Sequence, residues 1–238
     1  MERPKIIRDT TKEAWDYILS VLSNVSTAPV LINDDTLEVC RPVMENEEWC
    51  QWPASAKQHH CRVGGLLEHT AEVLRFALAS VATVDKLPQP EGVKLTKHGY
   101  PFLDVESVVT AVIWHDVMKT RDYTCVADKD DPSRIRVSHH PYHQYVHHIP
   151  GGYAAFVSHF ENLAAKRSFK LMGFDHIKPC RRWMEKVGHI ILSHHGRTEW
   201  GSPVEPISLE AIIVHQADTM SARYDHIARE PENSKHDK

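Results

Sequence analysis

The chain has 238 residues, of which 42% are hydrophobic and 25% charged, with a formal net charge of −4. This composition excludes general disorder. The acidic balance argues against a protein that holds long nucleic acids by neutralising many phosphates, because that mode needs a surplus of Lys and Arg.

No apolar run approaches the roughly 18 residues that span a bilayer, and the first residues are charged where a signal peptide has an apolar core. The five cysteines are irregularly spaced and include no Cys-x-x-Cys pair, which fits a reducing compartment. We therefore expect a cytoplasmic protein without membrane contact. The sequence carries no signal of oligomeric state.

In the first half of the chain, apolar residues recur at helical spacing over residues 11–25, 66–84 and 105–117. Thr10 or Thr11 is the expected cap of the first helix. Residues 26–60 contain prolines and no sustained period, which favours loops with at most one short helix, and residues 87–101 are expected to form a connection. The third helix is apolar on nearly every side, so we expect it to be central.

The second half begins with residues 123–150, which are polar and irregular and too long for an ordinary connection. We expect this segment to be functional or partly disordered. Helical spacing resumes over residues 152–166, 177–193 and 208–228. Strand-like alternation is scarce, so the sequence predicts an all-α fold.

Histidine occurs 18 times, and neutral imidazole is the commonest metal ligand. His115 and Asp116 end the apolar central helix, where two adjacent ionisable groups are costly to bury unless something pairs with them. His69, the His194-His195 pair and Asp218 also lie in apolar helical segments. Helical bundles build metal sites in their cores in this way.

The chemistry of these donors narrows the choice of metal. Imidazole and carboxylate without nearby cysteine suit Mn, Fe, Co, Ni or Zn, and Mg is less natural where several imidazoles converge. The sequence predicts divalent metal ions, either one or two, and does not select among these elements.

The order His69, His115-Asp116, His194-His195, Asp218 resembles the H…HD…D signature of the HD-domain superfamily of metal-dependent phosphohydrolases. The short sequence motifs around these residues are most similar to those of the YhaM-type 3'-to-5' exoribonuclease branch. These motifs are His59-His60, GGLLEHT at 64–70, LSHHG at 192–196, EWGSP at 199–203 and LEAIIVHQAD at 209–218. The resemblance extends from about Pro53 to Ala228.

The resemblance implies an HD-type helical bundle over residues 53–228, with a metal site in its core. Residues 1–52 would then be a helix and loops that pack on this core, and residues 229–238 a polar tail that we expect to be disordered. Exoribonucleases of the branch carry an N-terminal OB-fold that helps to hold RNA. Only about fifty residues precede the motifs here, so we expect no OB-fold.

The resemblance also implies a ligand set. One metal would be held by His69, His115, Asp116 and Asp218. A second would be held by Asp116, as a bridge, with His148, His194 and His195. We align His148-Ile149 with the Gly-His-Ile of the branch, and His143, His147 and His159 remain alternatives to His148.

The expected catalytic residues are Asp116 and Lys119. Lys119 follows His115 by four residues and is expected to reach the substrate phosphate as a point charge. Arg121, Arg197 and Arg223 are further candidates for anion contacts, and His60 for the pocket lining. The histidines of residues 139–147 read as a solvated loop, or as a lid or an accidental metal trap.

The leading functional hypothesis is hydrolysis of a phosphate ester or phosphodiester in a nucleotide or short oligonucleotide, by attack of a metal-bound hydroxide. The acidic balance favours small substrates or strand ends over long RNA. The alternative is an HD-type di-iron oxygenase acting on a small organic substrate, which the same ligands would serve. A non-catalytic nucleotide sensor would predict a degraded ligand set, whereas this one is complete.

Overall fold

The computed structural model describes residues 9–23, 32–84, 86–87, 103–127, 135–166 and 177–233. The expected connection at residues 87–101 lies outside this part of the chain except for Leu87, as do residues 24–25 and 234–238. The elements in chain order are α1 (Asp9–Leu22), α2 (Asp34–Met44), α3 (Glu47–Gln51), α4 (Gly65–Val84), α5 (Val105–Trp114), α6 (Lys119–Asp122), β1 (Tyr123–Ala127), β2 (Ile135–His139), α7 (Tyr142–Tyr145), α8 (His148–Lys166), α9 (Ile177–Ser193), the 3₁₀ turn η2 (Thr198–Trp200) and α10 (Leu209–Asn233).

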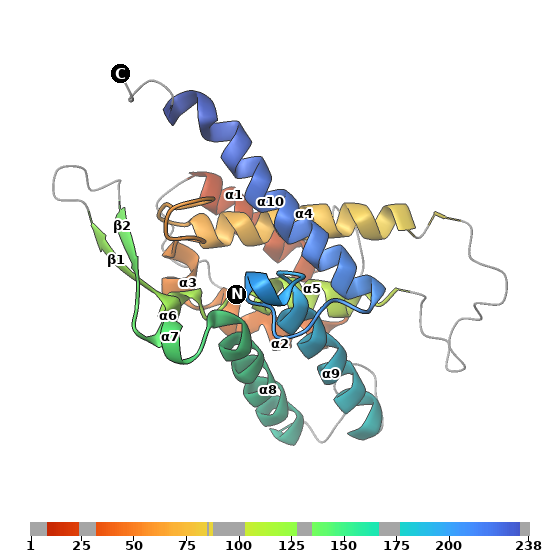
Figure 1. The fold of residues 1–238 in the computed structure, drawn as a ribbon. Coiled ribbons are helices and arrows are strands. Elements are labelled where there is room, and N and C mark those ends of the chain that lie inside the picture. Colours follow the sequence, from red (N-terminus) through yellow and green to blue (C-terminus); the bar gives the residue numbers. More distant parts are fainter. Residues whose placement is uncertain are drawn as a thin grey trace.

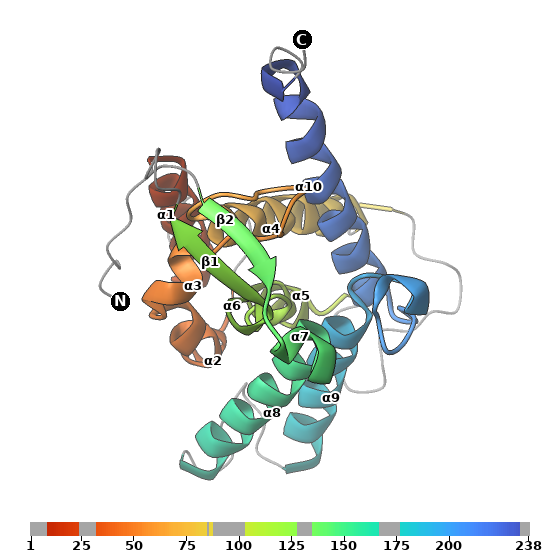
Figure 2. The same cartoon turned by 60° about the vertical axis from the view of Figure 1, so that its left-hand side comes forward.

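Helix α5 lies at the centre of the bundle. It packs against α2, α4, α8, α9 and α10, while α10 crosses α4 and α1 lies against α4. Figures 1 and 2 both show α8 and α9 side by side, below α5. Every residue of α5 from Ser107 to Trp114 is buried, as expected for a helix that is apolar all round.

The described residues contain one small sheet, the antiparallel pair β1–β2, in which Tyr123 is opposite His139. This hairpin lies at the edge of the molecule beside α6 and α7 (Figure 1). The prediction of an all-α fold is confirmed. None of the described helices is long and apolar enough to cross a membrane.

The expectation of irregular structure over residues 123–150 was wrong in part. Its described residues, 123–127 and 135–150, form the strands β1 and β2, α7 and the start of α8, which begins at His148 and not at the predicted residue 152. The strands have only five residues each, and the alternation of apolar and polar residues in β2 is confined to Ile135–Ser138, which is too short to stand out from the polar sequence around it.

The stretch of residues 26–60 holds two helices in its described part, where at most one was expected. Asn33 caps α2 by accepting a hydrogen bond from Asp35 N at 3.0 Å, and Asn46 caps α3 by accepting one from Trp49 N at 3.1 Å. Helix α3 has five residues, too few to show a period, whereas the buried residues of α2 recur at three and four positions around the internal Pro42. In both helices the Asn cap marks the start.

The first helix is not capped by Thr10 or Thr11, because α1 begins at Asp9. Both threonine hydroxyls donate instead to Glu68 Oε1 on α4, at 2.6 and 2.7 Å. The two hydroxyls that the sequence assigned to the helix cap therefore hydrogen-bond to the carboxylate of Glu68, which is far away in the sequence.

The central helix is shorter than the predicted 105–117, since α5 ends at Trp114 and residues 115–118 form a turn before α6. The other helices agree closely with the prediction. At α10, Ser208 Oγ accepts from Ala211 N at 3.1 Å, and the helix continues past the expected Ala228 to Asn233.

Candidate metal centre

Asp116 lies between two groups of imidazoles, at the point where the chain leaves α5. Its Oδ2 is 3.2 Å from His115 Nε2 and 3.5 Å from His69 Nε2. Its Oδ1 is 3.3 Å from His148 Nε2 and 3.6 Å from His194 Nε2. Each carboxylate oxygen therefore faces a different pair of imidazoles.

Asp218 and His195 complete the two groups. Asp218, from α10, places Oδ1 3.0 Å from His69 Nε2 and 3.9 Å from His115 Nε2. His195 follows α9 and belongs to the other group. Potential ligand atoms lie within 4.8 Å of one another in His69, His115 and Asp218, and likewise in Asp116, His148, His194 and His195.

The imidazoles are oriented by hydrogen bonds at Nδ1, which leave Nε2 for a ligand. Three of the Nδ1 atoms donate to backbone carbonyls at 2.7 Å, namely His115 to Val112, His194 to Ile191 and His195 to Trp200. A metal-ligating histidine typically donates its other ring N–H in this way, which fixes the tautomer and the ring direction.

The remaining two imidazoles are oriented by side chains that sequence analysis missed. His69 Nδ1 lies 2.9 Å from Ser221 Oγ, and this hydroxyl donates to Glu72 Oε2 at 2.8 Å. His148 Nδ1 lies 2.7 Å from Asp122 Oδ2. Ser221 follows Asp218 by three residues on α10, so helical spacing from an expected ligand was the available signal.

Several atoms at the centre of the cluster lack hydrogen bonds. Asp116 Oδ1 and the Nε2 atoms of His148 and His194 are buried and have no hydrogen-bond partner among the described residues, whereas Asp116 Oδ2 is paired with Lys119. A buried polar atom without a partner costs about 1–3 kcal/mol. A divalent cation bound by these atoms would remove this cost, so the donor set fits a metal in chemistry as well as in arrangement.

The protonation states suit cation binding. Burial lowers the pKa of His69 and of His195 to about 4, and lowers the pKa of His148 well below its ordinary value. These rings are therefore neutral near pH 7, as a ligand must be. His115 differs, because Asp116 outweighs the effect of burial and raises its pKa.

The carboxylates and Lys119 are charged. Burial by itself raises the pKa of Asp116, but His115 and Lys119 outweigh it and hold that pKa well below its usual range. His69 has the same effect on the pKa of Asp218. For Lys119, the lowering by burial is outweighed by Asp116, which raises the pKa of the ammonium.

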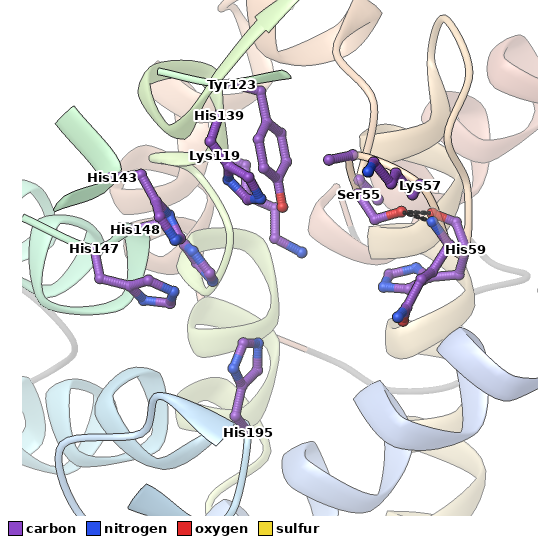
Figure 3. Close-up of a pocket in the computed structure, with 13 residues that line it drawn as sticks. Ser55, Lys57, His59, Lys119, Tyr123, His139, His143, His147, His148 and His195 are labelled. Atoms are coloured by element: carbon purple, nitrogen blue, oxygen red, sulfur yellow. Dashed lines mark hydrogen bonds between the residues drawn. The ribbon is translucent and has the colours of Figure 1, made fainter. Parts of the chain in front are cut away.

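A cavity of about 400 Å³ opens beside the cluster. Figure 3 shows histidines on opposite sides of it, with His143, His147 and His148 facing His59, and His195 below. The cavity is lined by Ala54, Ser55, Ala56, Lys57, Gln58, His59, Lys119, Tyr123, His139, His143, His147, His148 and His195.

The structure does not bring all the predicted substrate-binding residues to this cavity. His60 is fully buried with its Nε2 3.2 Å from Glu72 Oε1, and its neighbour His59 is in the wall instead. Arg121, Arg197 and Arg223 are exposed and are not among the lining residues.

Of the alternatives to His148, only His143 and His147 are near the cavity. His159 stacks on Trp114 with ring centroids 5.7 Å apart. His148 lies beside Asp116, with its Nε2 3.3 Å from Asp116 Oδ1, and its role as a ligand stays a prediction.

Comparison with known proteins gives a family match and curated relatives. The HD domain family model matches residues 59–223, more than half of the chain. A 3'-5' exoribonuclease YhaM from Bacillus pumilus (strain SAFR-032) is 26% identical over 189 residues, which are 79% of this chain and 48% of that protein. The chain thus spans about half the length of this curated relative. No solved structure matches the chain. The family match and the order of the clustered residues agree, and the chain belongs to the HD domain family.

Proposed function

We propose that this chain is a metal-dependent phosphohydrolase that cleaves the terminal phosphodiester of a short oligonucleotide or the phosphate ester of a nucleotide. The observation that carries the proposal is the position of Asp116, whose two oxygens face two separate groups of imidazoles. Family membership supports hydrolysis, and the printed activity of the relative favours a nucleic acid substrate.

The donor set has room for two cations. His69, His115 and Asp218 would hold one, and His148, His194 and His195 the other, with Asp116 between them. When bound, such cations lower the pKa of water and neutralise charge on a phosphoryl group. The Nδ1 hydrogen bonds hold the ligands in place beforehand, so little reorganisation is needed when a cation binds.

Lys119 supplies positive charge at the cavity wall. Its Nζ lies 2.5 Å from Asp116 Oδ2, and the residue is also part of the cavity lining. An ammonium in this position attracts a phosphate group towards the metal centre as a point charge. We assign Lys119 to phosphate binding on this ground.

The cavity favours a single nucleotide unit over a long strand. Its volume of about 400 Å³ lies at the small end of the range of roughly 300–1,000 Å³ for ligand pockets. Tyr123 and His59 offer aromatic rings that can stack on a base. The walls also carry Lys57, which adds a cation near the entrance.

The test uses a 5'-labelled RNA oligomer and a panel of mononucleotides, incubated with the protein and Mn²⁺, with a chelator as control. We expect metal-dependent shortening of the oligomer from its 3' end or release of phosphate from a mononucleotide. A ladder of shortened oligomers identifies an exonuclease, and phosphate release alone identifies a nucleotidase. Fully metal-loaded protein that acts on neither substrate would contradict the proposal.

A further inference from the structure

A second cluster of potential ligands lies in the cavity wall, next to the metal centre. It consists of Asp122 at the end of α6, His143 in α7 and His147 just before α8, and their ligand atoms lie within 4.8 Å of one another. We propose that these three residues form a separate binding site for a divalent transition-metal cation of the zinc type.

Asp122 provides the first argument, because the hydrogen bonds of its carboxylate all go to one of its two oxygens. The side chain is fully buried, and Oδ2 lies 2.7 Å from His148 Nδ1 and 3.1 Å from His143 Nδ1. His148 N donates to the same oxygen at 3.2 Å. Its Oδ1 is buried and has no hydrogen-bond partner in the described part of the chain. A cation would compensate this oxygen, which is otherwise costly to bury.

The second argument is the spacing of the donors. In a tetrahedral zinc site with metal–ligand distances of about 2.0–2.2 Å, the ligand atoms are roughly 3.3–3.5 Å apart. His143 Nδ1 and Asp122 Oδ2 are 3.1 Å apart and share a hydrogen bond, so a cation that bound both atoms would displace the shared proton. A small shift of one side chain would bring both atoms to a common cation.

His147 can join them at little cost. Its ring centroid is 4.9 Å from that of His143. Ile149 N donates to His147 Nδ1 at 3.5 Å, which is at the limit of a hydrogen bond and restrains the ring weakly.

The donors indicate which cations the site prefers. Two imidazoles and a carboxylate suit Zn²⁺, Co²⁺ or Ni²⁺, whereas Mg²⁺ and Ca²⁺ prefer oxygen ligands. Three protein ligands leave a coordination position open. His143 and His147 face the cavity (Figure 3), so that position is accessible from the cavity and would add positive charge to its wall.

The experiment counts zinc in the full chain. Wild type, a His143→Ala/His147→Ala double variant and a control are dialysed against the same micromolar free Zn²⁺, and bound zinc per chain is measured by mass spectrometry. The control is His140→Asn. His140 is exposed and its Nδ1 accepts from Tyr142 N at 3.1 Å, and asparagine keeps an acceptor while removing an imidazole from the same segment.

We expect the double variant to bind one zinc ion fewer than wild type, while His140→Asn binds as many as wild type. Equal zinc in all three proteins would overturn the proposal, as would an equal loss in the control. Circular dichroism checks that the fold is kept. The readout does not depend on turnover, so this inference and the proposed hydrolase activity can fail separately.

Discussion

Lys119 Nζ lies 2.5 Å from Asp116 Oδ2, and the two side chains are only 6% and 1% exposed. The pair is formed across the turn that follows α5, because Asp116 precedes Lys119 by three residues. Removal of one partner from a buried ion pair costs about 3–5 kcal/mol, since the other charge is left uncompensated. The ion pair at the candidate metal centre therefore also contributes to the stability of the fold around it.

The first prediction concerns Asp116→Ala. Because Asp116 faces both groups of imidazoles, its loss should lower metal binding and reduce turnover by more than the 10–100-fold typical of residues that only orient a ligand. Steady-state kinetics and metal analysis measure both effects, and circular dichroism should show nearly unchanged helical content. Asp16→Ala, on the exposed side of α1, is the control. Unchanged turnover in Asp116→Ala would refute the assignment.

The second prediction uses a double-mutant cycle of Lys119→Met and Asp116→Asn in chelator-treated protein. The two residues are in contact, so their effects on the free energy of unfolding should not add, and the coupling should be about 0.5–3 kcal/mol. Urea denaturation measures it. Lys57→Met is the control, since Lys57 is exposed in the same cavity. Additive effects of the first pair would mean that the contact contributes nothing.

The third prediction is that metal removal destabilises the protein. A cation at 100 times its dissociation constant stabilises the folded state by about 2.7 kcal/mol. For a chain of this size, a chelator should then lower Tm by roughly 5–10 °C. Differential scanning fluorimetry measures the shift, and added Mn²⁺ or Zn²⁺ should reverse it. The Asp116→Ala variant should respond less than wild type, and an equal response would place the stabilising metal elsewhere.

The fourth prediction concerns Ser221→Ala. The Ser221 hydroxyl connects Glu72 to His69 Nδ1, so its loss should leave the His69 ring less well oriented. We expect metal affinity to fall by about 10–100-fold and activity to recover at high metal concentration. Ser80→Ala is the control, because Ser80 Oγ donates only within α4, to Phe76 O. Loss of activity that excess metal does not restore would indicate a different role.

The central part of the cluster could be predicted from the sequence for a physical reason. His115 and Asp116 end an apolar helix, and ionisable groups in such a place require compensation. The motif order then indicated partners in three other helices. The structure brings His69, His194 and Asp218 to them, as the resemblance implied.

The surroundings of the cluster could not be predicted in the same way. Asp122 and Ser221 act through contacts that depend on how the helices pack, since their partners are 26 and 152 residues away in the chain. The exposed arginines were chosen by charge alone, and charge does not tell which face of a helix meets the cavity. For the two strands, five residues each gave an alternation too short to separate them from the polar sequence around them.

The fifth prediction concerns acid stability at the start of α10. Glu210 Oε1 accepts from Lys186 Nζ at 2.6 Å and from Asp104 N at 3.0 Å, which ties α10 to α9 and to the start of α5. Burial raises the pKa of Glu210, but these hydrogen bonds outweigh it and hold the pKa below its ordinary value of 4.5. The ionised carboxylate therefore stabilises the fold above pH 4.5, and this stabilisation is lost as the pH falls through the lowered pKa.

Glu210→Gln should accordingly be less stable than wild type at pH 6, and the difference should shrink as the pH falls below about 4.5. Urea denaturation at a series of pH values measures it. Because the comparison is between two proteins at each pH, protonation of the histidines in the metal centre affects both and largely cancels. Glu185→Gln is the control, since Glu185 is exposed on α9 and its ion pair with Arg181 is long, at 3.9 Å. If the difference in free energy of unfolding between wild type and Glu210→Gln stays constant with pH, Glu210 stabilises the fold through its shape and not through its charge.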